Sequence, residues 1–391
     1  MTRTGKYPDP LRYAAARLHR SLRRRQVAGL VSWDAVEAGA LRPGCTALIG
    51  MCHQLPHVLI GNLACLSAHA GSALDEVIVV VDSVRGCLPE GLEARATAAA
   101  APLRLRFLYY SDAQARSADR IRLPYLYAWL SWSIALAACE TRTALLHDYD
   151  AFILDDTLAR RLHGFTASGA AIEGIRWYAS NGIRPEDRLA TTFEAILDVA
   201  WLRSFPPVML FNQVGRIGAR RVDFDILLDI QANHLAPERR QIAPMGAGSL
   251  VHPSQMVHQF TMARRAPGAA LPVFSLPMIP FLEWLGGVPA AIETATARIT
   301  AARDRTLPFF DGLAVNFTEL RTAEVDWCLK QMLQICEARG IDPGRPLHAY
   351  GAALYRLAET PPEDVWAGDF TPGQRRWIAA TAGGGSLSPP W

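Results

Sequence analysis

The sequence predicts an α/β protein in which a sheet of parallel strands is flanked by helices. Short apolar or β-branched runs alternate with longer segments of helical periodicity, and several of the short runs end in polar or acidic residues. Strands that alternate with helices favour parallel neighbours joined by right-handed crossovers. With 391 residues, the chain has room for one large domain with additions or for two domains.

The first predicted elements are a helix, a strand, a helix and a strand. Residues 7–42 have apolar residues at helical spacing, and Pro43-Gly44 ends the pattern. Thr46–Cys52 is predicted to be a short buried strand, and Val58–Ala70 a helix. Glu76–Asp82 is the clearest strand because it is β-branched and is closed by an acid.

Two more helices and two more strands follow in alternation. Residues 94–101 suggest a short helix, and the alternating pattern of 103–110 indicates a third strand. We expect one long helix over 120–139 and a fourth strand that runs into Asp148. The carboxyl ends of such strands lie at one edge of a sheet, where ligands bind.

The fourth strand ends in two acids that are one residue apart. Asp148 and Asp150 lie between the apolar runs 144–146 and 151–154, so burial is expected, and buried acids need a compensating cation. In an extended segment both would point to one face and reach one ion, with Tyr149 turned away. Oxygen ligands suit Mg²⁺ or Mn²⁺. A bare Asp-x-Asp also fits a solvated turn between two buried segments.

The acid pair, with the order of elements around it, resembles the nucleotide-binding half of GT-A glycosyltransferases over about residues 45–260. The resemblance implies a Rossmann-like mixed sheet flanked by helices, with helical N- and C-terminal additions. It also implies a nucleotide-diphosphate-sugar donor and Mn²⁺ or Mg²⁺, with Asp150 as direct ligand and Asp148 touching ribose or metal. His252 lies where a late histidine of the family completes the metal site or contacts the diphosphate.

Three other residues are candidates for nucleotide binding. His53 could stack on or bond to the base, or be an ordinary histidine at the edge of the sheet. Asp82 could accept from a base N–H or a ribose hydroxyl, or simply end its strand in a turn. Arg122 could reach the diphosphate, or be a solvated helix start. No GxGxxG or GxxxxGK[ST] follows the first strand, which disfavours a dinucleotide or P-loop site.

The second half of the domain supplies candidates for the acceptor side. We predict a short strand at 207–212 and a helix at 222–231. An inverting enzyme needs a carboxylate base, for which Asp223 and Asp225 are the candidates and Glu194 a further option. Four aromatic residues suit either stacking on a sugar ring or core packing: Trp177, Tyr178, Trp201 and Phe205.

The predicted domain organisation has four parts. They are a helical N-terminal extension (1–44), a GT-A-like nucleotide-sugar and acceptor domain (45–270), a mostly helical C-terminal region (271–382) with helices at 289–305 and 322–339, and a disordered Gly/Ser/Pro-rich tail (383–391).

Composition limits the partners and the compartment. A net charge of +3 does not suggest nucleic acid, and seven cysteines without a CxxC pair indicate reduced thiols. The first residues lack the apolar core of a signal peptide, and no apolar run reaches the about 18 residues of a membrane span. We therefore expect a cytoplasmic protein. The basic run at 17–25 indicates a solvated helix face or, less often, weak contact with anionic lipid heads.

Together these features predict a metal-dependent glycosyltransferase (class EC 2.4) with an unidentified acceptor of saccharide, lipid-linked or small-molecule type. A metal-dependent phosphoesterase or nucleotidyltransferase is one alternative, disfavoured because further His and Asp clusters for a second metal are lacking. A non-catalytic nucleotide-binding protein with a GT-A fold is the other, disfavoured by the intact Asp148 and Asp150.

Overall fold

Four parallel strands form one half of a seven-stranded sheet. In sheet order they are β3 (Arg104–Tyr109), β2 (Glu76–Val81), β1 (Arg42–Met51) and β4 (Thr141–Asp148). All four match segments predicted from the sequence. The chain steps outward from β1 to β3 and then returns past β1 to form β4 on its other side. Ligands of open α/β sheets bind at such a reversal, outside the carboxyl ends of the two strands.

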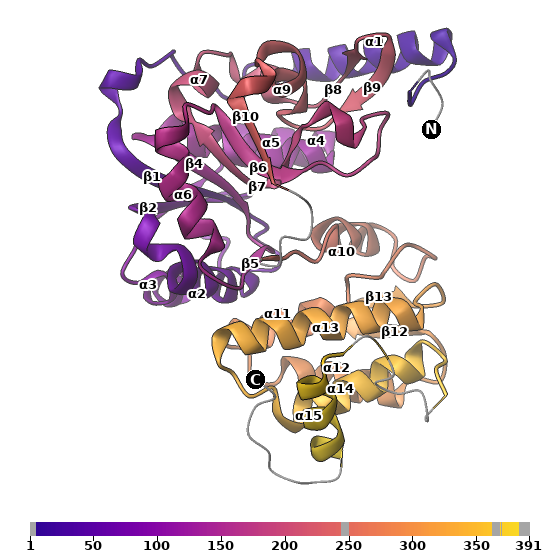
Figure 1. Cartoon of the computed structure of the whole chain (residues 1–391). Helices are drawn as coiled ribbons and strands as arrows, with labels where there is room; N and C mark the ends of the chain where they lie inside the picture. Colours follow the sequence, from indigo (N-terminus) through magenta and orange to yellow (C-terminus); the bar gives the residue numbers. More distant parts are fainter. Residues whose placement is uncertain (1–4, 244–249, 362–367, 369, 383–391) are drawn as a thin grey trace. The chain divides into compact units, whose positions relative to one another are not determined.

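Three further strands make the sheet mixed. They are β7 (Ala190–Asp198), β6 (Ile172–Arg176) and β10 (Arg240–Ala243), in this order beyond β4. β7 is antiparallel to both β4 and β6, and β10 is parallel to β6. The predicted fold class, a Rossmann-like mixed sheet flanked by helices, is confirmed (Figure 1). β6, β7 and β10 were not predicted from the sequence.

The computed structural model describes residues 5–243, 250–361, 368 and 370–382, and the chain divides into two units. The first unit comprises Met1–Pro56, Leu66–Ala151 and Asp156–Ser249 and contains the sheet. The second comprises His57–Cys65, Phe152–Asp155 and Leu250–Trp391. The boundaries predicted at residues 44 and 270 stay predictions, and the predicted tail at 383–391 lies outside the described residues.

Helices connect and cover the strands. Those up to residue 234 are α1 (Pro10–Val27), α2 (Val58–Ala70), α3 (Leu92–Ala100), α4 (Asp112–Ile121), α5 (Pro124–Ala138), α6 (Thr157–Ser168), α7 (Val199–Arg203), α8 (Pro207–Leu210) and α9 (Leu228–His234). α5 covers one face of the sheet, where Trp129 and Leu130 share a core cluster with Leu48, Ile78 and Leu146. Because the register places Leu48 opposite both Ile78 and Leu146, these three strand residues form one buried layer.

Two predicted helices are shorter than expected. The helix expected over 120–139 corresponds to α5, which begins only at Pro124, because a proline disfavours helical geometry in the residue before it. The preceding helix α4 was not predicted. Arg122 ends α4 in a left-handed conformation (φ 54°). The helix expected over 7–42 begins at Pro10, where the Asp9 side chain caps it, and ends at Val27.

For residues 207–212 and 222–231, the predicted type of secondary structure was wrong. The first segment is the short helix α8 and not a strand. The second begins as the strand β9 (Arg220–Phe224), which pairs with β8 (Gln213–Ile217), and becomes helical only in α9. Val222 and Phe224 are buried on one side of β9, a two-residue period that the apolar spacing of the longer segment concealed.

The second unit is mostly helical. Its helices beyond residue 250 are α10 (Met256–Arg265), α11 (Met278–Leu285), α12 (Ala291–Ala301), α13 (Thr322–Arg339), α14 (Gly344–Leu357) and α15 (Pro372–Ala382). Two antiparallel pairs accompany them: β5 (Phe152–Ile153) with β11 (Leu250–Val251), and β12 (Thr306–Phe310) with β13 (Leu313–Asn316). The predicted helices at 289–305 and 322–339 correspond to α12 and α13. Within the described ranges, no helix has the length and apolar character needed to cross a bilayer.

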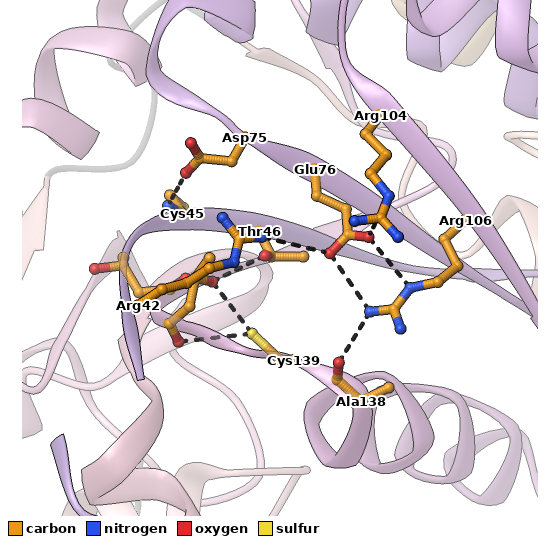
Figure 2. A network of polar contacts seen from close by, with 11 residues as sticks. Arg42, Cys45, Thr46, Asp75, Glu76, Arg104, Arg106, Ala138 and Cys139 are labelled. Atoms are coloured by element: carbon orange, nitrogen blue, oxygen red, sulfur yellow. Dashed lines mark hydrogen bonds and ion pairs between the residues drawn. The ribbon is translucent and has the colours of Figure 1, made fainter. Parts of the chain in front are cut away.

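Figure 2 shows an ion-pair network at the amino end of β2, on the edge of the sheet opposite to the predicted site. Glu76 has a side chain that is 2% exposed, and its Oε1 lies 3.2 Å from Arg106 Nε and 3.5 Å from Arg104 Nε. Arg42 Nη2 is 3.9 Å from Glu76 Oε2. Arg106 also donates to the Ala138 carbonyl at the end of α5 (2.9 Å). One buried carboxylate therefore links β1, β2 and β3, and Arg106 connects them to α5.

We expect Glu76→Gln to lower the free energy of unfolding by about 2–3 kcal/mol, because arginines that are partly buried lose their counter-charge. Urea denaturation measures the change. Arg104→Gln is the matched control, since its side chain is 70% exposed and its loss costs below about 1 kcal/mol. Equal losses of unfolding free energy in the two variants would show that the burial of the Glu76 carboxylate does not determine how much the network stabilises the protein.

Candidate metal and nucleotide site

The parallel register brings three predicted site residues to one edge of the sheet. His53 follows β1, Asp82 follows β2, and Asp148 ends β4. β1 lies between the other two strands, with Gly50 opposite Asp148. The strand order thus places the candidates for nucleotide binding beside the acid pair.

His53 and Asp82 are bonded to each other. Asp82 Oδ1 accepts from the backbone N–H of His53 (2.8 Å) and lies 2.6 Å from its ring Nδ1. A carboxylate at Nδ1 favours the tautomer in which Nδ1 carries the proton and fixes the orientation of the imidazole. This contact joins the ends of β1 and β2, and the side chains stay 31% and 12% exposed. Contact of either residue with a nucleotide remains a prediction.

Asp148 and Asp150 come together through a turn and not through an extended strand. β4 ends at Asp148, and the Ala151 N–H donates to the Asp148 carbonyl (2.9 Å), which closes a turn over Tyr149 and Asp150. The expectation that the two acids share one face of a strand was therefore wrong in its geometry. Asp150 is 5% exposed, whereas Asp148 is half-buried.

His252 joins this acid pair because of a short ladder. β11 ends at Val251, which pairs with Phe152 of β5, and Phe152 follows Asp150 by two residues in the chain. One ligand atom each of Asp148, Asp150 and His252 lies within 4.8 Å of the others. Two ligands that each bind one ion at about 2.0–2.6 Å fit such a separation. Two carboxylates and an imidazole therefore form a donor set suited to a divalent cation.

The electrostatic surroundings of Tyr149 also favour a cation. Burial raises the pKa of its phenol well above the ordinary value, and the negative charges of Asp150, Asp82 and Asp148 raise it further. Tyr149 is 4% exposed and stays neutral. Three carboxylates thus act on one buried side chain. They make the electrostatic potential negative at the carboxyl edge of the sheet.

The two predicted base candidates have different environments. Asp223 lies on β9 and accepts from Lys6 Nζ (3.1 Å), Tyr7 Oη (3.1 Å) and Arg20 Nη2 (3.4 Å). Its carboxylate is therefore held by the N-terminal segment and α1. Both carboxylate oxygens of Asp223 are therefore already engaged by these donors.

Asp225 has the raised pKa that a general base requires. Burial raises the pKa of its carboxyl to about 6, and the charges of Asp223 and Asp148 raise it as well. The Ile226 N–H, which donates to Asp225 Oδ1 at 2.7 Å, and Arg20 oppose this shift. The effect of Asp148 on this pKa indicates that the two carboxylates lie in the same region of the first unit. The sequence alone does not distinguish Asp225 from Asp223, whereas their contacts in the folded structure do.

The remaining candidates are distributed around this site. Arg122 is exposed and donates from Nε to the Asp119 carbonyl (2.8 Å) at the end of its own helix, so its contact with a diphosphate remains a prediction. Glu194 is 1% exposed and paired with Arg161 of α6, which makes it a structural group of the sheet.

The aromatic candidates differ in exposure. Trp177 is 4% exposed in the core, and Tyr178 stacks on it at 4.7 Å with a 17° interplanar angle. Tyr178 is 47% exposed and interacts electrostatically with Asp225. Trp201 and Phe205 pack edge to face against each other, and both pack against the main core. Among these four candidates, Tyr178 therefore has the exposed ring closest in environment to Asp225.

Comparison with known proteins gives fold-level likenesses only. No family model and no curated protein matches the chain. Among solved structures it is similar to TarS from S. aureus (12% identity, 84% of this chain and 92% of that chain, TM-score 0.35). It is also similar to glucosyl-3-phosphoglycerate synthase from Mycobacterium tuberculosis in complex with Mn²⁺ and uridine diphosphate (14%, 69% and 81%, 0.34).

A third similar structure is the mannosyltransferase PcManGT from Pyrobaculum calidifontis in complex with GDP-Man and Mn²⁺ (15% identity, 84% of this chain and 95% of that chain, TM-score 0.32). A mannosyltransferase is thus among the solved structures to which the chain is similar. Because the identities and TM-scores are this low, no residue role passes from them to this chain.

We expect Asp225→Asn to stabilise the protein near neutral pH. A carboxyl whose pKa is about 6 in the folded state and 3.8 otherwise makes folding less favourable as pH rises from about 4 through 6. The neutral isostere should therefore have a free energy of unfolding that is about 1–3 kcal/mol larger at pH 7.5, measured by urea denaturation. At pH 4 its free energy of unfolding should equal that of the wild type. Measurements in EDTA exclude bound metal.

The matched change Asp223→Asn should have the opposite sign at pH 7.5. It weakens the contacts with Lys6 and Arg20 and should lower the free energy of unfolding by about 1–3 kcal/mol. A gain in stability for Asp223→Asn, or none for Asp225→Asn, would contradict the distinction between the two carboxylates.

Proposed function

We propose that this chain is a divalent-metal-dependent glycosyltransferase that takes its sugar from a nucleotide-diphosphate donor. The observation that carries the proposal is the convergence of Asp148, Asp150 and His252 at the carboxyl end of β4. This strand lies beside β1 at the point where the order of the sheet reverses. Ligands bind there in open α/β sheets, and a diphosphate beside two carboxylates requires a cation between them.

Asp150 and His252 would hold the cation, with Asp148 as a further ligand or a partner of the ribose. A mixed set of carboxylates and imidazole favours Mn²⁺ over Mg²⁺, which prefers oxygen ligands alone. When bound, the cation neutralises the charge that develops on the departing diphosphate. Asp82 holds the His53 ring at the neighbouring strand end, where it would stack on the base.

The acceptor would bind on the side of Asp225. This carboxylate would take the proton from the acceptor hydroxyl if the enzyme inverts, since a base with a pKa of about 6 is ionised yet still basic near neutral pH. Tyr178 offers an exposed aromatic face beside it for a sugar ring, supported from behind by Trp177. A retaining enzyme would not use Asp225 in this way. The acceptor would be a saccharide, a lipid-linked glycan or a small molecule.

Two alternatives have different requirements. A phosphoesterase or nucleotidyltransferase with two metals needs a second cluster of ligands about 3.5–4 Å from the first ion. Over the described residues, the metal-type group is the single one at Asp148, Asp150 and His252, which favours the transferase. A nucleotide-binding protein without activity would bind a donor and metal but release no product.

The first test of the site is Asp150→Asn. We expect calorimetry to show that wild-type protein binds UDP or GDP more tightly with Mn²⁺ than with EDTA, and that the variant loses this difference because one ligand is neutralised. Asp156→Asn is the control, since that carboxylate is 67% exposed and pairs with Arg160. Unchanged metal-dependent affinity in Asp150→Asn would overturn the assignment.

The second test is release of nucleoside diphosphate from a panel of UDP-, GDP- and dTDP-sugars, with and without saccharide acceptors. We expect turnover that EDTA abolishes and that Asp225→Asn reduces by about 10²–10⁴-fold with little change in KM for the donor. Full turnover in Asp225→Asn would remove it as the base and indicate retention. Donor binding without any turnover across the panel would leave the binding-protein alternative.

A further inference from the structure

The outer face of α1 has an unusual concentration of exposed apolar side chains. The large hydrophobic residues that are exposed in the described part of the chain are Leu11 (80%), Leu18 (63%), Leu22 (48%) and Tyr178 (47%). Three of these four lie on α1, at spacings of seven and four residues, which aligns them along one side of the helix. Single exposed leucines are ordinary, but a stripe of three on one helix face marks a contact surface.

The opposite face of α1 is anchored to the first unit. Tyr13 and Val27 are buried, and α1 runs beside β8 and β9 (Figure 1). Arg20 bonds to Asp223 (3.4 Å), and Arg24 donates to the Val208 carbonyl from Nη2 (2.9 Å). These contacts fix the rotation of the helix about its axis. The leucine stripe therefore points away from the unit to which α1 is attached.

The charge of α1 determines which partner fits the stripe. Its sequence contains six arginines and no acidic residue, and its last turn carries Arg24 and Arg25. Arg12, Arg17 and Arg25 are exposed and lie on the flanks of the stripe. Leucines between exposed arginines are the pattern of a helix that lies in the plane of a membrane interface, with guanidinium groups on lipid phosphates and leucines at the acyl boundary.

We propose that α1 binds the surface of an anionic membrane through Leu11, Leu18 and Leu22. The stripe inserts at the level of the head groups, and the flanking arginines supply the preference for negative lipids. The helix is too polar on its inner face to cross the bilayer, so the attachment is peripheral. This binding does not depend on the proposed glycosyl transfer, because no residue of the metal group takes part in it.

Co-sedimentation with vesicles tests the proposal. Full-length protein should bind vesicles of phosphatidylcholine with about 30% phosphatidylglycerol at least about tenfold more tightly than vesicles of phosphatidylcholine alone, and salt should weaken the binding. The variant Leu11→Gln/Leu18→Gln/Leu22→Gln should lose binding by at least about tenfold. Its fold, followed by thermal unfolding, should persist because all three side chains are exposed.

Two further variants separate this proposal from others. Arg17→Gln/Arg25→Gln should reduce the preference for anionic vesicles, and Tyr178→Gln, which removes the fourth exposed hydrophobic residue, should bind as wild type does. Retained vesicle binding in the triple leucine variant would overturn insertion. A dimer in analytical ultracentrifugation that the triple variant dissociates, without vesicle binding by wild type, would assign the stripe to a second copy of the chain.

Discussion

The mutual repulsion of the Asp148 and Asp150 carboxylates is the constraint on which the arrangement of the site depends. Asp150 is buried and Asp148 half-buried, and their negative potential extends to Tyr149 and Asp225. Carboxylates placed this close together suit a divalent cation, whose charge offsets theirs. The sheet places the acid pair at the end of β4, next to β1, and the pairing of β5 with β11 adds the imidazole of His252. The surroundings thus supply donors and concentrate negative charge where a metal–diphosphate complex would lie.

The strands from β1 to β4 could be predicted because their signals are local. Each is a short apolar run closed by a polar residue, and Glu76–Val81 is fully buried as its composition suggests. β6 and β7 were not predicted, because Glu173 and Glu194 interrupt the apolar patterns of these strands. Arg161 of α6 forms ion pairs with both glutamates, so the sheet accepts them. That compensation joins residues far apart in the chain, and no local window contains it.

The candidate site was partly predictable for the same reason. Strand ends in a parallel sheet meet at one edge, so His53, Asp82 and Asp148 could be grouped from sequence order alone. The sequence left both an extended segment and a turn open at Asp150, because Tyr149 and Ala151 are compatible with either. The contrast between Asp223 and Asp225 was also hidden. It depends on Lys6, Tyr7 and Arg20, which lie about two hundred positions earlier in the chain.

The two faces of α1 make different contributions to the structure. Its inner face brings Arg20 to Asp223, and this cation also lowers the pKa of Asp225 against the effect of burial. Its outer face carries the leucine stripe. Because one rigid helix carries both faces, the position of Arg20 is tied to whatever contacts Leu18 and Leu22. The same helix therefore presents Arg20 to Asp223 on one side and the leucine stripe to solvent on the other.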